Sequence, residues 1–237
     1  MPADPDFGEI RWAHQKIIGL NDPCRYLAAV YDEIMKKKQA KKTDYKPIAD
    51  FLYEVGILAK TPRSGFHFLG SGHQSVAEHL NRVGYIGYVL AMLDGTVDVG
   101  RVVTMCLFHD LGEARTSDLN YVHQKYANAN EDKAIEDLAA TLPFGGDIRR
   151  MVRDLKERTK TEALLAKDAD QLEWILSLKE QADTGNARAK TWIPSAVKRL
   201  RTKVAQALAP VILRTPSDDW WFSNKNDKWW VHRNKKK

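Results

Sequence analysis

Residues 105–113 read MCLFHDLGE, and this stretch decides the fold because an apolar run ends directly in a His-Asp pair. Six of the seven residues from 102 to 108 are apolar, which predicts a helix that is buried on most sides. His109 and Asp110 at the buried end of that helix would be unfavourable without a partner. A divalent metal ion is one such partner, since imidazole nitrogen and carboxylate oxygen are common metal ligands. A His-Asp hydrogen bond inside a core is the alternative.

The composition is that of a soluble globular protein with one sizeable core. The chain has 237 residues, of which 43% are hydrophobic and 29% are charged. No apolar run is long enough for a transmembrane helix, and the first residues lack the apolar segment of a secretory signal. Cys106 lies in the apolar run, whereas Cys24 does not. We therefore expect a cytoplasmic protein with reduced cysteines and no membrane partner.

The net charge of +6 is concentrated in lysine runs between residues 36 and 42 and at residues 232–237. Such a charge can steer phosphorylated small molecules or contact nucleic acid without sequence preference. A solvated charged tail explains it equally simply, and we favour that interpretation.

Hydrophobic periodicity predicts an all-α fold, since no segment shows a convincing strand pattern. We expect a helical N-terminal extension over residues 1–45, a helical bundle over residues 46–213, and an irregular C-terminal tail rich in Trp and Lys over residues 214–237. A loop is expected over residues 66–72, and an irregular polar stretch over residues 116–130. The helices expected within the bundle cover residues 47–58, 76–93, 99–110, 131–142, 145–158, 161–183 and 195–209.

Two further helices carry metal-type side chains among apolar residues. Residues 75–78 form a capping box, and the helix that they begin carries His79 at the edge of its apolar face. A satisfied core histidine is the alternative there. The helix over residues 161–183 carries Asp168 and Asp170 within its apolar stripe, where a carboxylate is unfavourable without a role. The pattern does not choose between the two, and both could instead face water.

Mixed nitrogen and oxygen donors from three helices suit an octahedral divalent ion with positions left for water and substrate. Such an ion makes its water acidic and neutralises a phosphoryl oxygen. Glu113 lies four residues after His109 and shares its helical face, so it could orient or deprotonate that water. Asp118, in the polar stretch that follows this helix, could assist the departure of the leaving oxygen.

With these motifs in place, the chain resembles an HD-domain phosphohydrolase of the branch that contains the 5′-deoxynucleotidases. The resemblance covers residues 51–175, and its matching segments are residues 62–66, 75–79, 109–113 with Asp118, and 167–173. It implies an HD-domain helical bundle and one divalent metal, and it selects Asp170 over Asp168. The implied metal ligands are His79, His109, Asp110 and Asp170.

The same resemblance implies catalytic roles for Glu113 and Asp118 and a substrate contact from Arg63. Phe66 stands where the branch usually has a Trp near the sugar, so we expect it to contact substrate too. The implied activity is cleavage of nucleoside 5′-monophosphates, deoxynucleotides in particular, to nucleoside and phosphate through a metal-activated water. The metal is Mn, Co, Mg, Zn or Fe, and a homodimer is a family-level expectation.

Two other functions remain open on the sequence alone. A nucleoside triphosphate triphosphohydrolase would use the same metal site. A non-catalytic helical module would instead stack its basic, aromatic C-terminus on single-stranded nucleic acid. The full ligand set together with Glu113 favours an enzyme whose partner is a nucleotide, and makes specific nucleic-acid binding unexpected.

Overall fold

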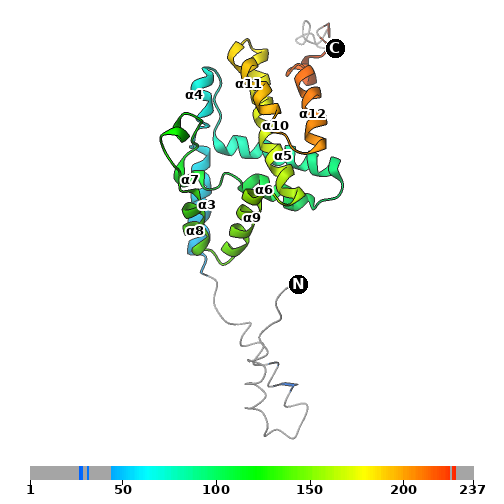
Figure 1. Cartoon of the computed structure of the whole chain (residues 1–237). Coiled ribbons are helices and arrows are strands. Elements are labelled where there is room, and N and C mark those ends of the chain that lie inside the picture. The colour runs from blue at the N-terminus through cyan, green and yellow to red at the C-terminus, as the bar shows by residue number, and fades with distance from the viewer. Residues whose placement is uncertain (1–26, 29–30, 32–43, 225, 228–237) are drawn as a thin grey trace, which may run out of the picture. The chain divides into compact units, whose positions relative to one another are not determined.

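The computed structural model describes residues 27–28, 31, 44–224 and 226–227. The described residues from Lys46 onward form one compact unit built from helices (Figure 1). Within these described residues the only extended pairing is an isolated antiparallel bridge between Pro62 and Ser75, so the all-α prediction is confirmed. The division into extension, bundle and tail stays a prediction, because most of residues 1–45 and residues 228–237 lie outside the described residues.

The helices follow one another with short connections and match most of the predicted ranges. Their bounds are α3 (Lys46–Val55), η1 (Gly56–Ala59), α4 (Gly65–Leu69), α5 (Val76–Asp94), α6 (Val99–Phe108), α7 (Glu113–Thr116), η2 (His123–Lys125), α8 (Glu131–Ala140), α9 (Gly145–Glu157), α10 (Thr161–Asp183), α11 (Ala187–Val197), α12 (Lys203–Arg214) and α13 (Asp219–Phe222).

Local capping side chains set several helix starts. At α5, the Ser75 side chain accepts a hydrogen bond from the Glu78 N–H, and the Glu78 carboxylate accepts one from the Ser75 N–H, which completes the predicted capping box. Asp98 caps α6 in the same way through the Arg101 N–H. Asn130 caps α8 by accepting a hydrogen bond from the Lys133 N–H.

Helix α10 is the central element of the compact unit. It contacts α5, α6, α9, α11 and α12 (Figure 1), and its side chains Leu165, Leu172, Ile175 and Leu178 are fully buried. A second apolar cluster joins η1, α5, α8 and α9. Because α10 lies between these neighbours, polar side chains on its inner face are surrounded by protein.

Helices α5 and α6 run antiparallel and touch at Gly87. A Cβ atom at this position would lie 2.4 Å from the Cys106 Sγ atom, so only glycine fits there. The close contact aligns the start of α5, which carries His79, with the residues that follow α6. Cys106 itself is a buried thiol without a disulfide, and burial raises its pKa to about 12. Cys24 lies outside the described residues.

Two predictions about element boundaries are wrong. The expected helix over residues 195–209 is instead two helices, α11 and α12, and each contains a proline, Pro194 or Pro210. Asn186 begins α11 early by accepting hydrogen bonds from two backbone N–H groups, and Thr202 begins α12 anew. The expected loop over residues 66–72 begins with the short helix α4.

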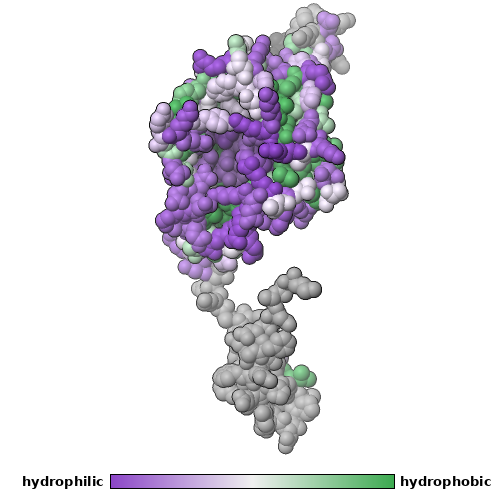
Figure 2. All heavy atoms as spheres, viewed as in Figure 1, coloured by the Kyte–Doolittle hydropathy of each residue, from purple (hydrophilic) through white to green (hydrophobic). Residues whose placement is uncertain are grey.

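The surface is mostly polar on the face shown in Figure 2, with hydrophobic side chains gathered along the side formed by α12. In the described part of the chain, no helix combines the length and the apolar character that crossing a bilayer requires. The cytoplasmic location stays a prediction.

Candidate metal centre

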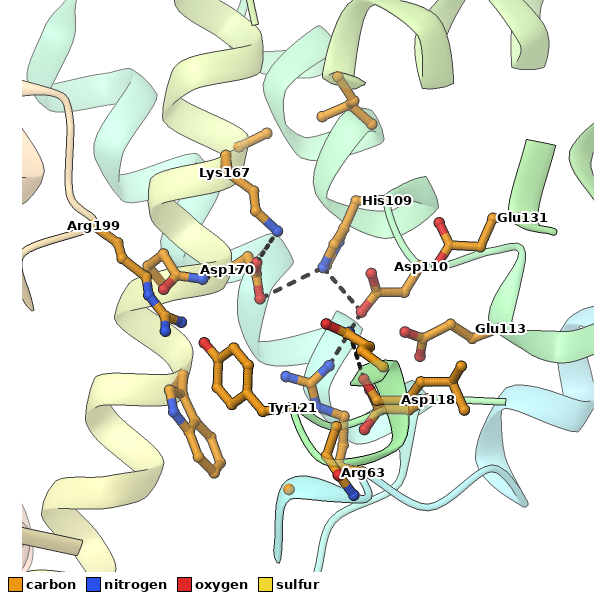
Figure 3. A pocket seen from close by; sticks show the side chains of 18 of the residues that line it. Arg63, His109, Asp110, Glu113, Asp118, Tyr121, Glu131, Lys167, Asp170 and Arg199 are labelled. Atoms are coloured by element: carbon orange, nitrogen blue, oxygen red, sulfur yellow. Dashed lines mark hydrogen bonds and ion pairs between the residues drawn. The ribbon is translucent and has the colours of Figure 1, made fainter. Parts of the chain in front are cut away.

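Four nitrogen and oxygen donors from α5, α10 and the residues after α6 converge, and Figure 3 shows three of them, on His109, Asp110 and Asp170. The Nε2 atom of His79 lies 3.3 Å from the Nε2 atom of His109 and 3.3 Å from Oδ1 of Asp170. The Oδ2 atom of Asp110 lies 3.2 Å from the His109 Nε2 atom and 3.6 Å from that of His79. Ligands about 2.0–2.2 Å from a shared ion stand roughly 3 Å apart, so these spacings fit donors around one divalent cation.

The electrostatics of the cluster also favour a cation. Burial lowers the pKa of His109, but the carboxylates of Asp110 and Asp170 overcome this and raise it to about 10. Burial likewise disfavours charge on Asp170, yet Lys167 and the two histidines hold its pKa well below the usual range. The Asp170 Oδ2 atom accepts from Lys167, which leaves Oδ1 facing the histidines. Two buried carboxylates thus bind positive charge strongly, whether it is a proton or a metal ion.

Each histidine is oriented by a partner on its other ring nitrogen. The Nδ1 atom of His109 lies 2.7 Å from the Cys106 carbonyl oxygen, so Nδ1 carries the proton and donates it. The Nδ1 atom of His79 lies 2.6 Å from Oε2 of Glu173. Both Nε2 atoms therefore face the cluster, and in the neutral imidazoles they are the atoms that carry the lone pair, which is the arrangement of metal-binding histidines.

Glu173 is the functional residue that sequence reasoning missed. It is fully buried, and its Oε1 atom accepts from Arg82 Nη2 at 2.7 Å and from Gln74 Nε2 at 2.7 Å. Burial alone would raise its pKa, but the hydrogen bond to His79 and the nearby charge of Arg82 lower it to about 2. The available signal was its spacing, because a residue three positions after Asp170 shares the same helical face.

We expect Glu173→Gln to bind divalent metal about 10–100-fold more weakly, because the amide no longer fixes the His79 ring with full charge. Glu180→Gln is a matched control: Glu180 also lies on α10 and accepts from Arg82 at 2.6 Å, but it does not touch His79. Metal affinity is measured by calorimetric titration of the two apo variants. Equal affinities would show that Glu173 supports only the fold.

Glu113 lies at the start of α7 and lines the same cavity as the cluster. Its Oε2 atom is buried and has no hydrogen-bond partner among the described residues. Burial, followed by the negative charges of Asp110 and Asp118, raises its pKa to about 9. A buried carboxyl group without a structural partner is available for proton transfer.

Arg63 and Asp118 lie next to the cluster and are linked to each other through the backbone of Ser64. The Nη1 atom of Arg63 donates to Oδ2 of Asp110 at 3.3 Å. The Oδ2 atom of Asp118 accepts from the backbone N–H of Ser64 at 2.6 Å, so Asp118 anchors the loop that carries Arg63. The structure thus brings both predicted residues to the centre, in the positions drawn in Figure 3.

Phe66 does not join them. Its side chain is buried in the core, with its ring centroid 5.5 Å from that of Trp174 in an edge-on contact. The aromatic side chains that line the cavity are Phe68, Tyr121, Trp174 and Trp192. The expected direct substrate contact from Phe66 therefore does not match its place in the core.

Asp168 has a different role from its neighbour Asp170. It is buried, and it accepts from the backbone N–H groups of Arg201 at 3.0 Å and Thr202 at 2.6 Å and from the Thr202 hydroxyl at 2.7 Å. Asp168 therefore fixes the link between α11 and α12. The open alternative in which both carboxylates face water is wrong.

His109, Asp110, Glu113 and Asp170 line one cavity of about 1000 Å³, whereas His79 is fully buried. Imidazole nitrogens and carboxylate oxygens beside an unpartnered acid are the donor types found in the metal sites of hydrolases. A family model described as HD domain matches residues 55–212, so the chain belongs to the HD domain family. It is a phosphohydrolase of that family, which implies a divalent metal cofactor.

Relatives and solved structures agree with this placement. A 5′-deoxynucleotidase from Vibrio vulnificus is 30% identical over 152 residues, which cover 58% of this chain and 75% of that protein. A 5′-deoxynucleotidase from Photorhabdus laumondii is 29% identical over 150 residues, covering 57% and 75%. The structure of a conserved hypothetical protein from Pyrococcus furiosus superposes with a TM-score of 0.60 and 26% identity over 70% of this chain and 99% of that one.

Proposed function

We propose that this protein hydrolyses nucleoside 5′-monophosphates, deoxynucleotides among them, to nucleoside and phosphate. The observation that carries the proposal is the cluster of two imidazoles and two carboxylates, all but His79 lining one cavity, beside the unpartnered carboxyl group of Glu113. The two relatives named as 5′-deoxynucleotidases support the choice of substrate.

In this proposal His79, His109, Asp110 and Asp170 hold the metal. Their donor set of two imidazole nitrogens and two carboxylate oxygens, without a thiolate, fits Mn, Co, Mg, Zn or Fe. A divalent cation held there would neutralise charge on the phosphoryl oxygens and make a water molecule more acidic.

The remaining roles belong to side chains that face the cluster. Arg63 presents its guanidinium to the phosphate, which a guanidinium binds through two parallel hydrogen bonds. Glu113 takes the proton of the attacking water. Asp118 holds the Arg63 loop in place through Ser64; assistance to the leaving oxygen stays a prediction.

A product-resolved screen tests the proposal. The purified protein is incubated with each candidate metal and with the mono-, di- and triphosphates of the four nucleosides and deoxynucleosides. We expect orthophosphate from monophosphates. Release of inorganic triphosphate instead would favour the triphosphohydrolase, and no turnover with any metal would contradict both.

Arg63→Ala is expected to raise the KM for a nucleoside monophosphate at least about tenfold, because a charge-assisted pair to phosphate is lost. Thermal stability should change little. Arg115→Ala is the matched control, since Arg115 also binds a carboxylate, that of Glu54, but lies away from the cavity lining. Steady-state kinetics and a melting curve for both variants separate the two roles. A fall in melting temperature with an unchanged KM would assign Arg63 to the fold.

The homodimer and the absence of a specific nucleic-acid partner stay predictions. Membership of the HD domain family argues against the non-catalytic nucleic-acid module.

A further inference from the structure

The cavity has a second wall whose charge is opposite to that of the carboxylate side. It carries basic side chains from the end of α9 and from the link between α11 and α12: Arg158, Lys198, Arg199 and Arg201. None of the four forms an ion pair with a carboxylate among the residues that the structure describes. Two other lysines of the cavity, Lys156 and Lys167, are by contrast paired with Asp132 and Asp170.

These basic residues are held in place by the backbone. Arg158 ends α9 in the left-handed region with φ of 52°, which a residue with a side chain rarely adopts. The α11–α12 link is fixed by Asp168, whose buried carboxylate binds two successive backbone N–H groups. The backbone positions of Arg158 and of the α11–α12 link are therefore set by the fold.

Arg199 shows most clearly how the wall faces the cavity. Its guanidinium carbon lies 5.0 Å from the centre of the Tyr121 ring, within the range of a cation–π contact. Figure 3 shows Arg199 on the α10 side of the cavity, across from Glu113 and Asp118. The two sides of the cavity therefore differ, with the carboxyl groups of Glu113 and Asp118 on one and unpaired positive charge on the other.

Unpaired like charges on one wall repel each other, and an anion that lies between them relieves that repulsion. Guanidinium groups suit phosphate in particular, because their parallel donors match its oxygens. At about 1000 Å³, the cavity is at the upper end of the ~300–1000 Å³ range of small-molecule sites, so it has room for more than the scissile phosphate and its nucleoside.

We propose that this basic wall, Arg158 with Lys198, Arg199 and Arg201, binds a second phosphate group of the nucleotide whose first phosphate is cleaved at the metal centre. This inference rests on the proposed function. The second group belongs either to a 5′-polyphosphate chain or to a phosphate on the 3′ side of the sugar. Both present the same chemistry to the wall.

Direct binding tests the proposal without turnover. Calorimetry compares deoxynucleoside 5′-monophosphates with the 3′,5′-bisphosphates and the 5′-triphosphates, for each of the four bases and with metal-free protein. We expect at least one of the doubly phosphorylated classes to bind about tenfold or more tighter than the monophosphate, and this preference to weaken at high salt. The class that shows the preference identifies the source of the second phosphate.

Variants of the basic wall test whether these residues cause the preference for a doubly phosphorylated nucleotide. The preference, taken as the ratio of the two dissociation constants, should fall at least about tenfold in the double variant Arg199→Ala/Arg201→Ala. Lys203→Ala removes the same kind of charge two residues from Arg201 but outside the cavity lining, so its ratio should stay within about twofold. Circular dichroism and melting curves confirm that the variants are folded.

Two results would overturn the inference: a wild-type protein without preference for either class, or a preference that survives in the double variant. A preference that the double variant loses, in a protein that hydrolyses no monophosphate, would uphold the basic wall and refute the proposed function. The same kinetic screen that tests the function supplies this distinction.

Discussion

Glu113→Gln is expected to fold, retain its metal and bind a nucleoside monophosphate, yet release phosphate at least about a hundredfold more slowly than the wild type. The amide keeps the shape and packing of the side chain but cannot take a proton. The Oε2 atom of Glu113 has no hydrogen-bond partner among the described residues, so the substitution breaks no hydrogen bond of that atom within this part of the chain. A loss in rate would therefore report on proton transfer rather than on folding.

The pKa of Glu113 adds a second readout. Burial and the charges of Asp110 and Asp118 raise it to about 9 in the protein without a cation, and a cation held by Asp110 opposes the second of these effects. We therefore expect the base to titrate between about 4.5 and 9 in the loaded enzyme, as a rising limb in the pH profile of kcat/KM. That limb should disappear in Glu113→Gln.

Glu131→Gln is the matched control, because Glu131 lines the same cavity and is exposed. Phosphate release is measured at saturating nucleotide, with metal content determined on the same samples. Equal rates for Glu113→Gln and the wild type would remove Glu113 from the mechanism. Equal losses in both Glu variants would mean that the charge of the cavity, and not one acid, controls the rate.

Local chemistry explains which parts of the fold could be predicted from the sequence. The starts of α5 and α6 depend on Ser75, Glu78 and Asp98, which lie within the helix turns that they cap. The break between α11 and α12 depends on Asp168, which binds the backbone of residues 33 and 34 positions further along the chain. No pattern within residues 195–209 contains that contact, so the sequence of this segment predicts one helix where the structure has two.

The same distinction holds for the site. His79, His109 and Asp110 stand out because polar groups interrupt apolar helix faces, and the structure brings them together with Asp170. The direction of the Phe66 side chain depends on its contact with Trp174, which is remote in sequence. Sequence reasoning therefore finds polar residues whose burial is unfavourable in free energy without a partner. It does not find side-chain orientations that depend on packing against residues remote in sequence.

Asp168 and Asp170 illustrate this limit, and they provide the second large expected effect. Both are buried carboxylates on α10, and periodicity did not separate them. In the structure Asp170 faces the two histidines, whereas Asp168 binds the backbone of Arg201 and Thr202. The pair therefore offers two isosteric substitutions on one helix with opposite consequences.

Asp170→Asn should lose its metal and at least about a hundredfold in phosphate release, since removing a ligand exceeds the 10–100-fold effect of an outer partner. Asp168→Asn should keep its metal but melt several degrees lower, because weakened charge-assisted hydrogen bonds cost about 1–3 kcal/mol. Added divalent metal should raise the Tm of the wild type and of Asp168→Asn, but not that of Asp170→Asn, because only a bound ion stabilises the folded state.

Metal content by mass spectrometry and melting curves with and without metal provide both measurements. If Asp168→Asn is metal-free and Asp170→Asn retains its metal, then Asp168 and not Asp170 is the ligand. An increase in Tm on adding metal in all three proteins would mean that the ion binds elsewhere.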